Sequence, residues 1–188
     1  MDFYNRSLSK EICIFSIDDF NISNEQDASQ LKNVYRCLFL NNDMLYFSFR
    51  REENLTDENT LRLLKIKISE TFNKDGAYVT LREMDETRFD SVGRISIKES
   101  TFDFLFDIWN YFYSCTFFVP KNGFAFSDYV DFQKRIKFQD KGGEKLLKAG
   151  HADFECIKGL GGDSLIVSYQ KDYQLPDLKK AALYAPRY

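Results

Sequence analysis

The chain is short of the side chains that enzymes most often use near neutral pH. Its 188 residues include one His, one Trp, three Pro and four Cys. A single imidazole offers little material for general acid–base catalysis, and isolated thiols are a weak basis for nucleophilic catalysis. The composition therefore predicts a protein that acts by binding, and not an enzyme.

The four cysteines, Cys13, Cys37, Cys115 and Cys156, lie far apart and form no C-x-x-C pair. With only His151 to add, they do not make a zinc-binding set, so we expect no metal and no other cofactor. Each cysteine lies in an apolar run, which predicts reduced residues in the core. Reduced thiols, together with an N-terminus that has no secretory-signal pattern, predict a cytoplasmic location.

The chain also lacks an excess of positive charge and any long uninterrupted apolar run. Its net charge is −3 and its pI is about 5.3, whereas a nucleic-acid binder needs a surplus of Lys and Arg. The longest apolar stretch, residues 102–119, is interrupted by Asp103, Asp107, Asn110 and Ser114, which makes it too polar for a membrane-spanning helix. We therefore expect a protein partner, and neither nucleic acid nor a membrane.

What the chain has in quantity is aromatic and acidic residues. It contains 19 Phe and 11 Tyr, more than one core layer needs, and Tyr gives large rigid contacts at protein interfaces. Acids gather near the N-terminus and bases within residues 134–148, a division that suits attraction to a basic partner. The residues that we predict to contact this partner are Asp18, Asp19, Glu25, Asp27, Glu52, Glu53, Tyr46, Tyr111 and Tyr129.

Residue patterns place strands mainly in the N-terminal half. Alternation and β-favouring composition predict a hairpin around Asn41-Asn42-Asp43 and a turn at residues 73–76. Thr56 is suited to capping a helix over residues 57–64, but the alternation of apolar and polar residues over Leu64–Ser69 favours a strand. The predicted strands are Glu11–Phe20, Val34–Leu40, Met44–Arg50, Leu63–Ser69, Ala77–Arg82 and Arg94–Lys98.

The C-terminal half predicts helices and a last hairpin. Ser100 precedes apolar residues spaced by three and four from Phe102 to Tyr113, the pattern of an amphipathic helix. Further predicted elements are a helix from Ser127 towards Gln139, a helix over Glu144–Lys148, and a hairpin of Phe154–Lys158 with Ser164–Tyr169. These elements predict a single α+β domain over residues 1–188, an antiparallel meander sheet with helices packed on it, and a loosely packed tail over residues 174–188.

Three sequence patterns are compatible with catalysis or with binding of a phosphate or metal ion, and each also has a purely structural interpretation. His151 would need Asp153 or Glu155 as a partner, and no activated nucleophile accompanies it. The Gly159–Asp163 segment resembles part of a phosphate-binding loop, but a strand pattern follows it, so a hairpin turn is favoured. Carboxylate pairs suited to a metal are Asp18 with Asp19, Asp85 with Glu86, and Asp103 with Asp107.

The whole chain, acidic, aromatic and without a catalytic constellation, resembles the immunity proteins that neutralise bacterial polymorphic toxins, including those of contact-dependent growth inhibition. The resemblance lies in this general profile and in no motif. It implies an antitoxin that binds a basic toxin domain through its carboxylates and occludes the active site. Two other functions stay open: a metal-dependent hydrolase or nuclease that uses clustered carboxylates, and a structural adaptor subunit.

Overall fold

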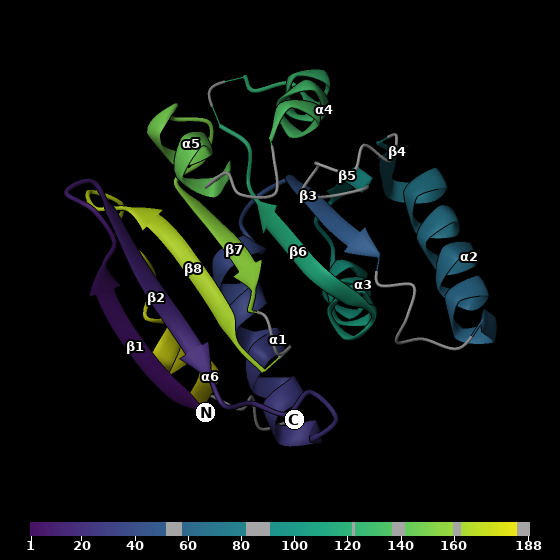
Figure 1. Cartoon of the computed structure of the whole chain (residues 1–188). Helices are drawn as coiled ribbons and strands as arrows, with labels where there is room; N and C mark the ends of the chain where they lie inside the picture. Colours follow the sequence, from purple (N-terminus) through teal and green to yellow (C-terminus); the bar gives the residue numbers. More distant parts are fainter. Residues whose placement is uncertain (52–57, 82–90, 122, 137–141, 160–162, 184–188) are drawn as a thin grey trace.

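The fold is an eight-stranded antiparallel sheet with helices on both faces (Figure 1). The computed structural model describes residues 1–51, 58–81, 91–121, 123–136, 142–159 and 163–183, and none of the helices in these ranges is both long and apolar enough to cross a bilayer. The strands are β1 (Asp2–Ser7), β2 (Ile12–Asp18), β3 (Met44–Arg51), β4 (Gly76–Thr80), β5 (Ser91–Ser96), β6 (Phe112–Phe118), β7 (Phe154–Lys158) and β8 (Leu165–Gln170). The helices are α1 (Glu25–Phe39), α2 (Glu58–Asp75), α3 (Glu99–Tyr111), α4 (Phe126–Arg135), α5 (Gly142–Lys148) and α6 (Leu178–Leu183).

The strands lie in the order β1-β2-β8-β7-β6-β3-β5-β4, and every adjacent pair is antiparallel. Strands that follow one another in the chain pair at β1–β2, β4–β5, β6–β7 and β7–β8, whereas β2–β8 and β3–β6 join distant segments. This arrangement confirms the predicted single α+β domain. It also places β1 at one edge of the sheet and β4 at the other.

The larger core lies between the sheet and helices α1, α3 and α6. Alternate residues of each strand point into it, because successive side chains of a strand face opposite sides. Tyr35 of α1 is fully buried and meets the rings of Phe106 and Phe117 edge-on, at centroid distances of 5.8 and 5.4 Å. Such aromatic pairs add about 0.5–1.5 kcal/mol beyond burial, so much of the aromatic content serves this core.

Helices α4 and α5 cover part of the opposite face of the sheet. Tyr129 of α4 and Leu146 and Leu147 of α5 pack there against Tyr46 and Phe118 of the sheet. In Figure 1 both helices lie at the upper end of the sheet, and no helix stands in front of the lower part of β1, β2, β8 and β7. This face is therefore covered at one end only.

The predictions of a strand over Val34–Leu40 and of a hairpin around Asn41-Asn42-Asp43 are wrong, because this segment forms the end of α1 and its C-cap, Leu40. Asn24 caps the helix by accepting hydrogen bonds from the backbone N–H groups of Gln26 and Asp27. The buried residues of α1 recur at spacings of three and four, a helical period that the β-favouring Val, Tyr and Cys content concealed. The cap residue at Asn24 was the sequence signal for this helix.

The prediction of a strand over Leu63–Ser69 is also wrong, because this segment lies in α2. Ile68 is 5% exposed, whereas Leu63 and Ile66 are 61% and 46% exposed. The apparent alternation arose because α2 carries apolar residues on its exposed side as well as on its buried side. The alternative prediction of a helix in this region is correct from Glu58 onward.

Helix α3 is present as predicted but ends earlier than its apolar pattern. The chain passes directly from Tyr111 at the end of α3 to Phe112 at the start of β6, a strand that sequence reasoning missed. The predicted helices α4 and α5 and the final hairpin of β7 and β8 are confirmed. The prediction of a loose tail is wrong for α6, where Leu178 and Ala182 are buried in the larger core and the helix packs on α1.

The cysteines divide into a buried pair and two more accessible residues. Cys115 and Cys156 are buried as predicted, whereas Cys37 is exposed and Cys13 is half-buried, which corrects the prediction of four core residues. Burial raises the pKa of the Cys115 thiol to about 12 and raises the pKa of Cys156 as well. Partial burial, and then the nearby Asp177, raise the pKa of Cys37.

We expect a thiol reagent at neutral pH to label Cys37 in the folded protein and to reach Cys115 and Cys156 only after unfolding. Because a raised pKa lowers the thiolate fraction, Cys37 should react more slowly than a free thiol, and faster as the pH rises. Timed labelling followed by mass spectrometry, with and without urea, measures both effects. Modification of Cys115 before Cys37 without urea would contradict the observed burial.

Candidate functional site

Three carboxylates come together at one end of the β1–β2 hairpin. Asp18 ends β2, and its partner across the ladder is Asp2 at the start of β1. Asp19 follows with a φ of 57°, in the left-handed region that Asp tolerates better than most residues. The hydroxyls of Tyr4 and Ser16 donate to Asp2 at 3.4 Å and to Asp18 at 3.3 Å, so these side chains share one side of the sheet. We call Asp2, Asp18 and Asp19 the acidic group.

The acidic group acts on its surroundings as a concentration of negative charge. The carboxylate of Asp2, followed by desolvation and then by Asp19 and Asp18, raises the pKa of the Tyr4 hydroxyl. Within the part of the chain that the structure describes, no Lys or Arg forms an ion pair with any of the three carboxylates. Surface carboxylates in this arrangement attract cationic groups from solution or from a partner.

A part of the sheet beside the acidic group is not covered by any described helix (Figure 1). A cross-strand row joins Tyr4, Ser16, Ile166 and Ile157 on β1, β2, β8 and β7. Tyr4 is 53% exposed, and the other three are half-buried. We call these four residues the open sheet face. Because it combines aromatic, aliphatic and hydroxyl groups beside negative charge, its chemistry suits contact with a basic protein surface.

The structure places the four N-terminal acids of the prediction in different roles. Asp18 and Asp19 belong to the acidic group, while Glu25 and Asp27 lie in the first turn of α1, where carboxylates also stabilise the helix dipole. Asp27 accepts a hydrogen bond from the backbone N–H of Asn21 at 2.7 Å, so it holds the loop before α1. Glu25 is exposed and stays a predicted contact.

The prediction that Tyr46 and Tyr129 are surface contacts is wrong. Tyr46 is 5% exposed and its hydroxyl donates to the carbonyl of Phe124 at 3.2 Å. Tyr129 is fully buried and donates to Ser48 Oγ at 3.0 Å. The pleat of β3 turns Tyr46 towards α4, and Tyr129 lies on the inner side of that helix, so both belong to the smaller core. Outside the described residues lie Glu52, Glu53 and the side chain of Tyr111.

Sequence reasoning missed Asp2 and Tyr4, because the first residues had the composition of a polar lead. Their place depends on the pairing of β1 with β2, which sets Asp2, Tyr4 and Arg6 on one side of the sheet. On the other side, the Phe3 ring lies 6.2 Å from that of Phe15 in β2. Apart from the two aromatic residues Phe3 and Tyr4 the strand is polar, so the sequence offers little signal for it.

The acidic group and the predicted basic region lie at opposite ends of the sheet. Strand β2 begins at Ile12, which lines a pocket with Leu147 of α5, and ends six residues later at Asp18. At about 3.4 Å per residue, the acidic group lies roughly 20 Å from the α5 end of the sheet. The described bases of the predicted basic region lie on α4 and α5, and they are Lys134, Arg135, Lys145 and Lys148.

The single histidine takes part in packing. His151 stacks on the ring of Phe124, with centroids 4.0 Å apart and 10° between the planes. Asp153, one of its two candidate partners, accepts from Lys121 Nζ at 2.6 Å, and the other, Glu155, is 3% exposed. Neither acid pairs with His151. Across the described ranges, no group of three or more His, Cys, Asp and Glu residues is placed to hold a metal ion.

The other two patterns also have structural roles where they are described. The backbone N–H of Gly159 donates to the carbonyl of Ser164 at 2.8 Å and closes the β7–β8 hairpin, as predicted for this glycine-rich segment. Asp103 forms an ion pair with Lys32 at 2.6 Å across α3 and α1. The described ranges do not include Asp85, Glu86 or the side chain of Asp107.

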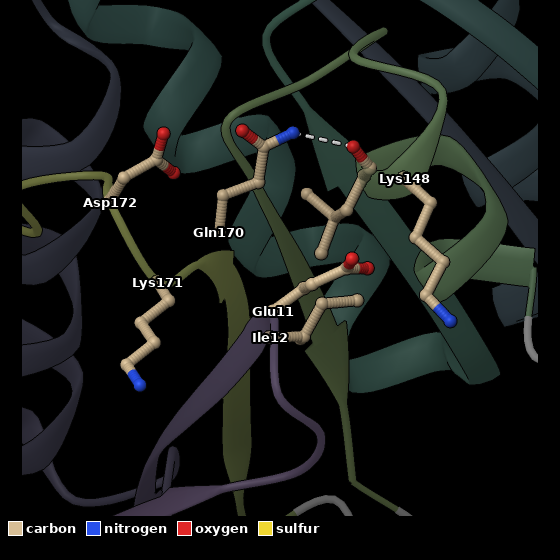
Figure 2. Close-up of a pocket in the computed structure, with 7 residues that line it drawn as sticks. Glu11, Ile12, Lys148, Gln170, Lys171 and Asp172 are labelled. Atoms are coloured by element: carbon tan, nitrogen blue, oxygen red, sulfur yellow. Dashed lines mark hydrogen bonds between the residues drawn. The ribbon is translucent and has the colours of Figure 1, made fainter.

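A pocket of about 600 Å³ lies between the start of β2, the end of β8 and α5 (Figure 2). Its charged lining residues are Glu11, Lys148, Lys171 and Asp172, two of each sign. Lys148 is held by an ion pair with Glu144 at 2.8 Å, and this hydrogen bond is the main cause of its raised pKa. In Figure 2 the amino groups of Lys148 and Lys171 lie on opposite sides of the view, and acids and bases line the pocket in equal number, so it does not gather one charge around a ligand.

A buried polar network joins α5 to the sheet. Thr116 of β6 donates to Glu155 Oε1 of β7 at 2.5 Å. Gly143 at the start of α5 lies against the same carboxylate, and a Cβ atom at this position would stand 1.4 Å from Glu155 Oε2. The lack of a side chain at Gly143 therefore lets α5 approach the buried Glu155.

Comparisons with known proteins found no relative of this chain. No family model, no curated protein and no solved structure matches the chain. The functional inference therefore rests on the acidic group and the open sheet face.

Proposed function

We propose that this protein is a protein-binding inhibitor, an immunity protein that binds a cognate toxin and occludes its active site. The observation that carries the proposal is the acidic group, whose three carboxylates border the open sheet face and have no Lys or Arg partner among the described residues. Toxins that act on nucleic acids or other anionic substrates hold them with Lys and Arg. A cleft of that kind is complementary to this surface.

Inhibition by this surface requires only that it fill the substrate-binding cleft of the toxin, and no catalytic step. The carboxylates of Asp18 and Asp19 take the place of an anionic substrate, while Ile157 and Ile166 supply contact area next to them. Close charge pairs across an interface couple by about 1.5–7 kcal/mol, although desolvation offsets part of the gain. The proposal includes a reducing bacterial cytoplasm as the location, which the four free thiols support.

The acidic group gives the test. Asp18→Lys combined with Asp19→Asn should weaken binding of a cognate toxin domain by at least about tenfold, or about 1.4 kcal/mol. Asn is chosen at position 19 because it tolerates the positive φ there. Titration calorimetry at low and high salt measures the effect, which should shrink as salt screens the charges.

The matched control is Asp131→Lys combined with Asp172→Asn, which changes the net charge equally on exposed residues at the other end of the sheet. This control should bind and protect a toxin-expressing host as the wild type does. Undiminished binding by the Asp18 and Asp19 variant would place the interface elsewhere. Metal-dependent hydrolysis by the purified protein would favour the hydrolase, and binding without inhibition would favour the adaptor subunit.

A further inference from the structure

We propose that the free edge of β1 pairs with β1 of a second copy of this chain, so that one sheet runs through both copies. The inference goes beyond the proposed function and does not depend on it. Strand β1 is the last strand at one edge of the sheet, and five of its six residues are exposed. A strand at an edge presents N–H and C=O groups that can pair with another strand.

Strand β1 lacks three of the devices that prevent edge pairing, namely Pro, Lys and a bulge. Its residues include no Pro and no Lys, and its register on β2 runs without a shift from Asp2 opposite Asp18 to Ser7 opposite Cys13. The inner face of the strand is the side that packs on α6, where Lys179 lies 5.9 Å from the Phe3 ring centre. The edge is therefore straight and compatible with a further strand.

The hydrogen bonds of the β1–β2 hairpin identify the backbone groups at the free edge. The N–H of Leu8 donates to the carbonyl of Ile12 at 2.9 Å, and these two residues continue the register of the ladder. Because bonded pairs alternate in an antiparallel ladder, the even-numbered residues of β1 bond to β2. The outward-pointing backbone groups are those of Phe3, Asn5 and Ser7.

A two-fold axis that passes through Tyr4 and relates the two copies pairs the outward backbone groups with each other. It also places residues of opposite charge face to face. The outward groups of Phe3 and Asn5 then bond to those of Asn5 and Phe3 in the second copy. Asp2 faces Arg6 of the partner subunit, Arg6 faces the partner's Asp2, and the two Tyr4 side chains meet between them. These are non-bonded pairs of the ladder, with Cα atoms about 4.5 Å apart and side chains at their closest.

This register gives Asp2 and Arg6 the partners that they do not have in their own chain. Among the described residues, neither forms an ion pair. A shift of the two-fold axis to Phe3 or Asn5 loses both charge pairs. Asp18 and Asp19 lie on β2 and beyond it, outside the new pairing, so toxin binding and dimerisation can be tested separately.

Sedimentation velocity of the full chain, from about 1 µM to about 1 mM, tests the proposal, because a single strand pair is a small interface of moderate affinity. Asp2→Arg sets like charges opposite each other at both pairs, and so does Arg6→Asp. Each variant alone should dissociate at least about tenfold more readily than the wild type. An equal mixture of the two should form a heterodimer of wild-type affinity, because two positive residues then face two negative ones.

Hydrogen exchange read by NMR tests the register. The amides of Phe3, Asn5 and Ser7 should become protected as the concentration rises, whereas those of Tyr4 and Arg6 should be protected throughout. A wild type that stays monomeric to about 1 mM overturns the proposal. So do single variants that dimerise as the wild type does, or a mixture in which association is not restored. These measurements use no toxin, so their failure leaves the proposed function intact.

Discussion

Replacement of Phe117 by Ala should lower the free energy of unfolding by about 3–5 kcal/mol, a large share of the 5–15 kcal/mol typical of a domain. Phe117 is 2% exposed in β6, and its ring lies 5.4 Å from that of Tyr35 and 5.7 Å from that of Phe39. Strand β6 is held between β3 and β7, so the backbone cannot move in to fill the space left by the ring. The residual cavity adds to the lost burial.

Urea denaturation followed by circular dichroism measures this effect. Leu183→Ala in α6 is the control, because Leu183 is 62% exposed and its truncation should change stability by no more than about 0.5 kcal/mol. If both variants unfolded at the wild-type urea concentration, the aromatic core would not have the structure observed around α1 and β6.

The second large effect is expected for Gly143→Ala, which should destabilise the protein by about 0.5–2 kcal/mol net. The new Cβ would lie 1.4 Å from Glu155 Oε2, so the buried carboxylate has to move and its hydrogen bond from Thr116 is strained or lost. Hydrogen bonds to charged groups contribute about 1.5–3 kcal/mol each. This loss outweighs the gain of about 1 kcal/mol that Ala brings over Gly in a helix.

The neighbouring Gly142→Ala is the matched control, because its Cβ would meet Ile136 Cγ2 at 3.3 Å, a contact that a small shift relieves. We expect it to change stability by less than about 1 kcal/mol. A double-mutant cycle with Glu155→Ala isolates the contact, since Gly143→Ala should cost less once the carboxylate is gone. Equal costs in both backgrounds would show that the carboxylate is not the obstacle.

These two variants and those of the acidic group separate stability from binding. Phe117 lies in the larger core, and Gly143 packs against the buried Glu155. Asp18 and Asp19 lie at the surface end of a strand, so their replacement should change binding far more than unfolding. This contrast is what the proposed function predicts, because that proposal assigns binding to the surface carboxylates.

The amino-acid sequence alone carried enough information for the α+β class, the final hairpin and the amphipathic start of α3. In these segments the local pattern and the final environment agree: glycine closes the β7–β8 turn, and apolar residues at helical spacing face the core. The same holds for Asp18 and Asp19, whose charge keeps them out of the core. Strong local signals of this kind are independent of partners far along the chain.

In other segments, the secondary structure and the burial of side chains depend on tertiary packing and could not be predicted from local sequence. Val34–Leu40 has strand-forming residues but is helical, because as part of α1 it buries Tyr35 among rings from α3 and β6. Tyrosine is a residue type common at protein interfaces, but Tyr46 and Tyr129 are buried between α4 and the sheet. The acidic group exists because β1 pairs with β2 and brings Asp2 beside Asp18. Propensity is worth tenths of a kcal/mol per residue, whereas burying a large side chain is worth about 1.5–3 kcal/mol, so long-range packing prevails wherever the two disagree.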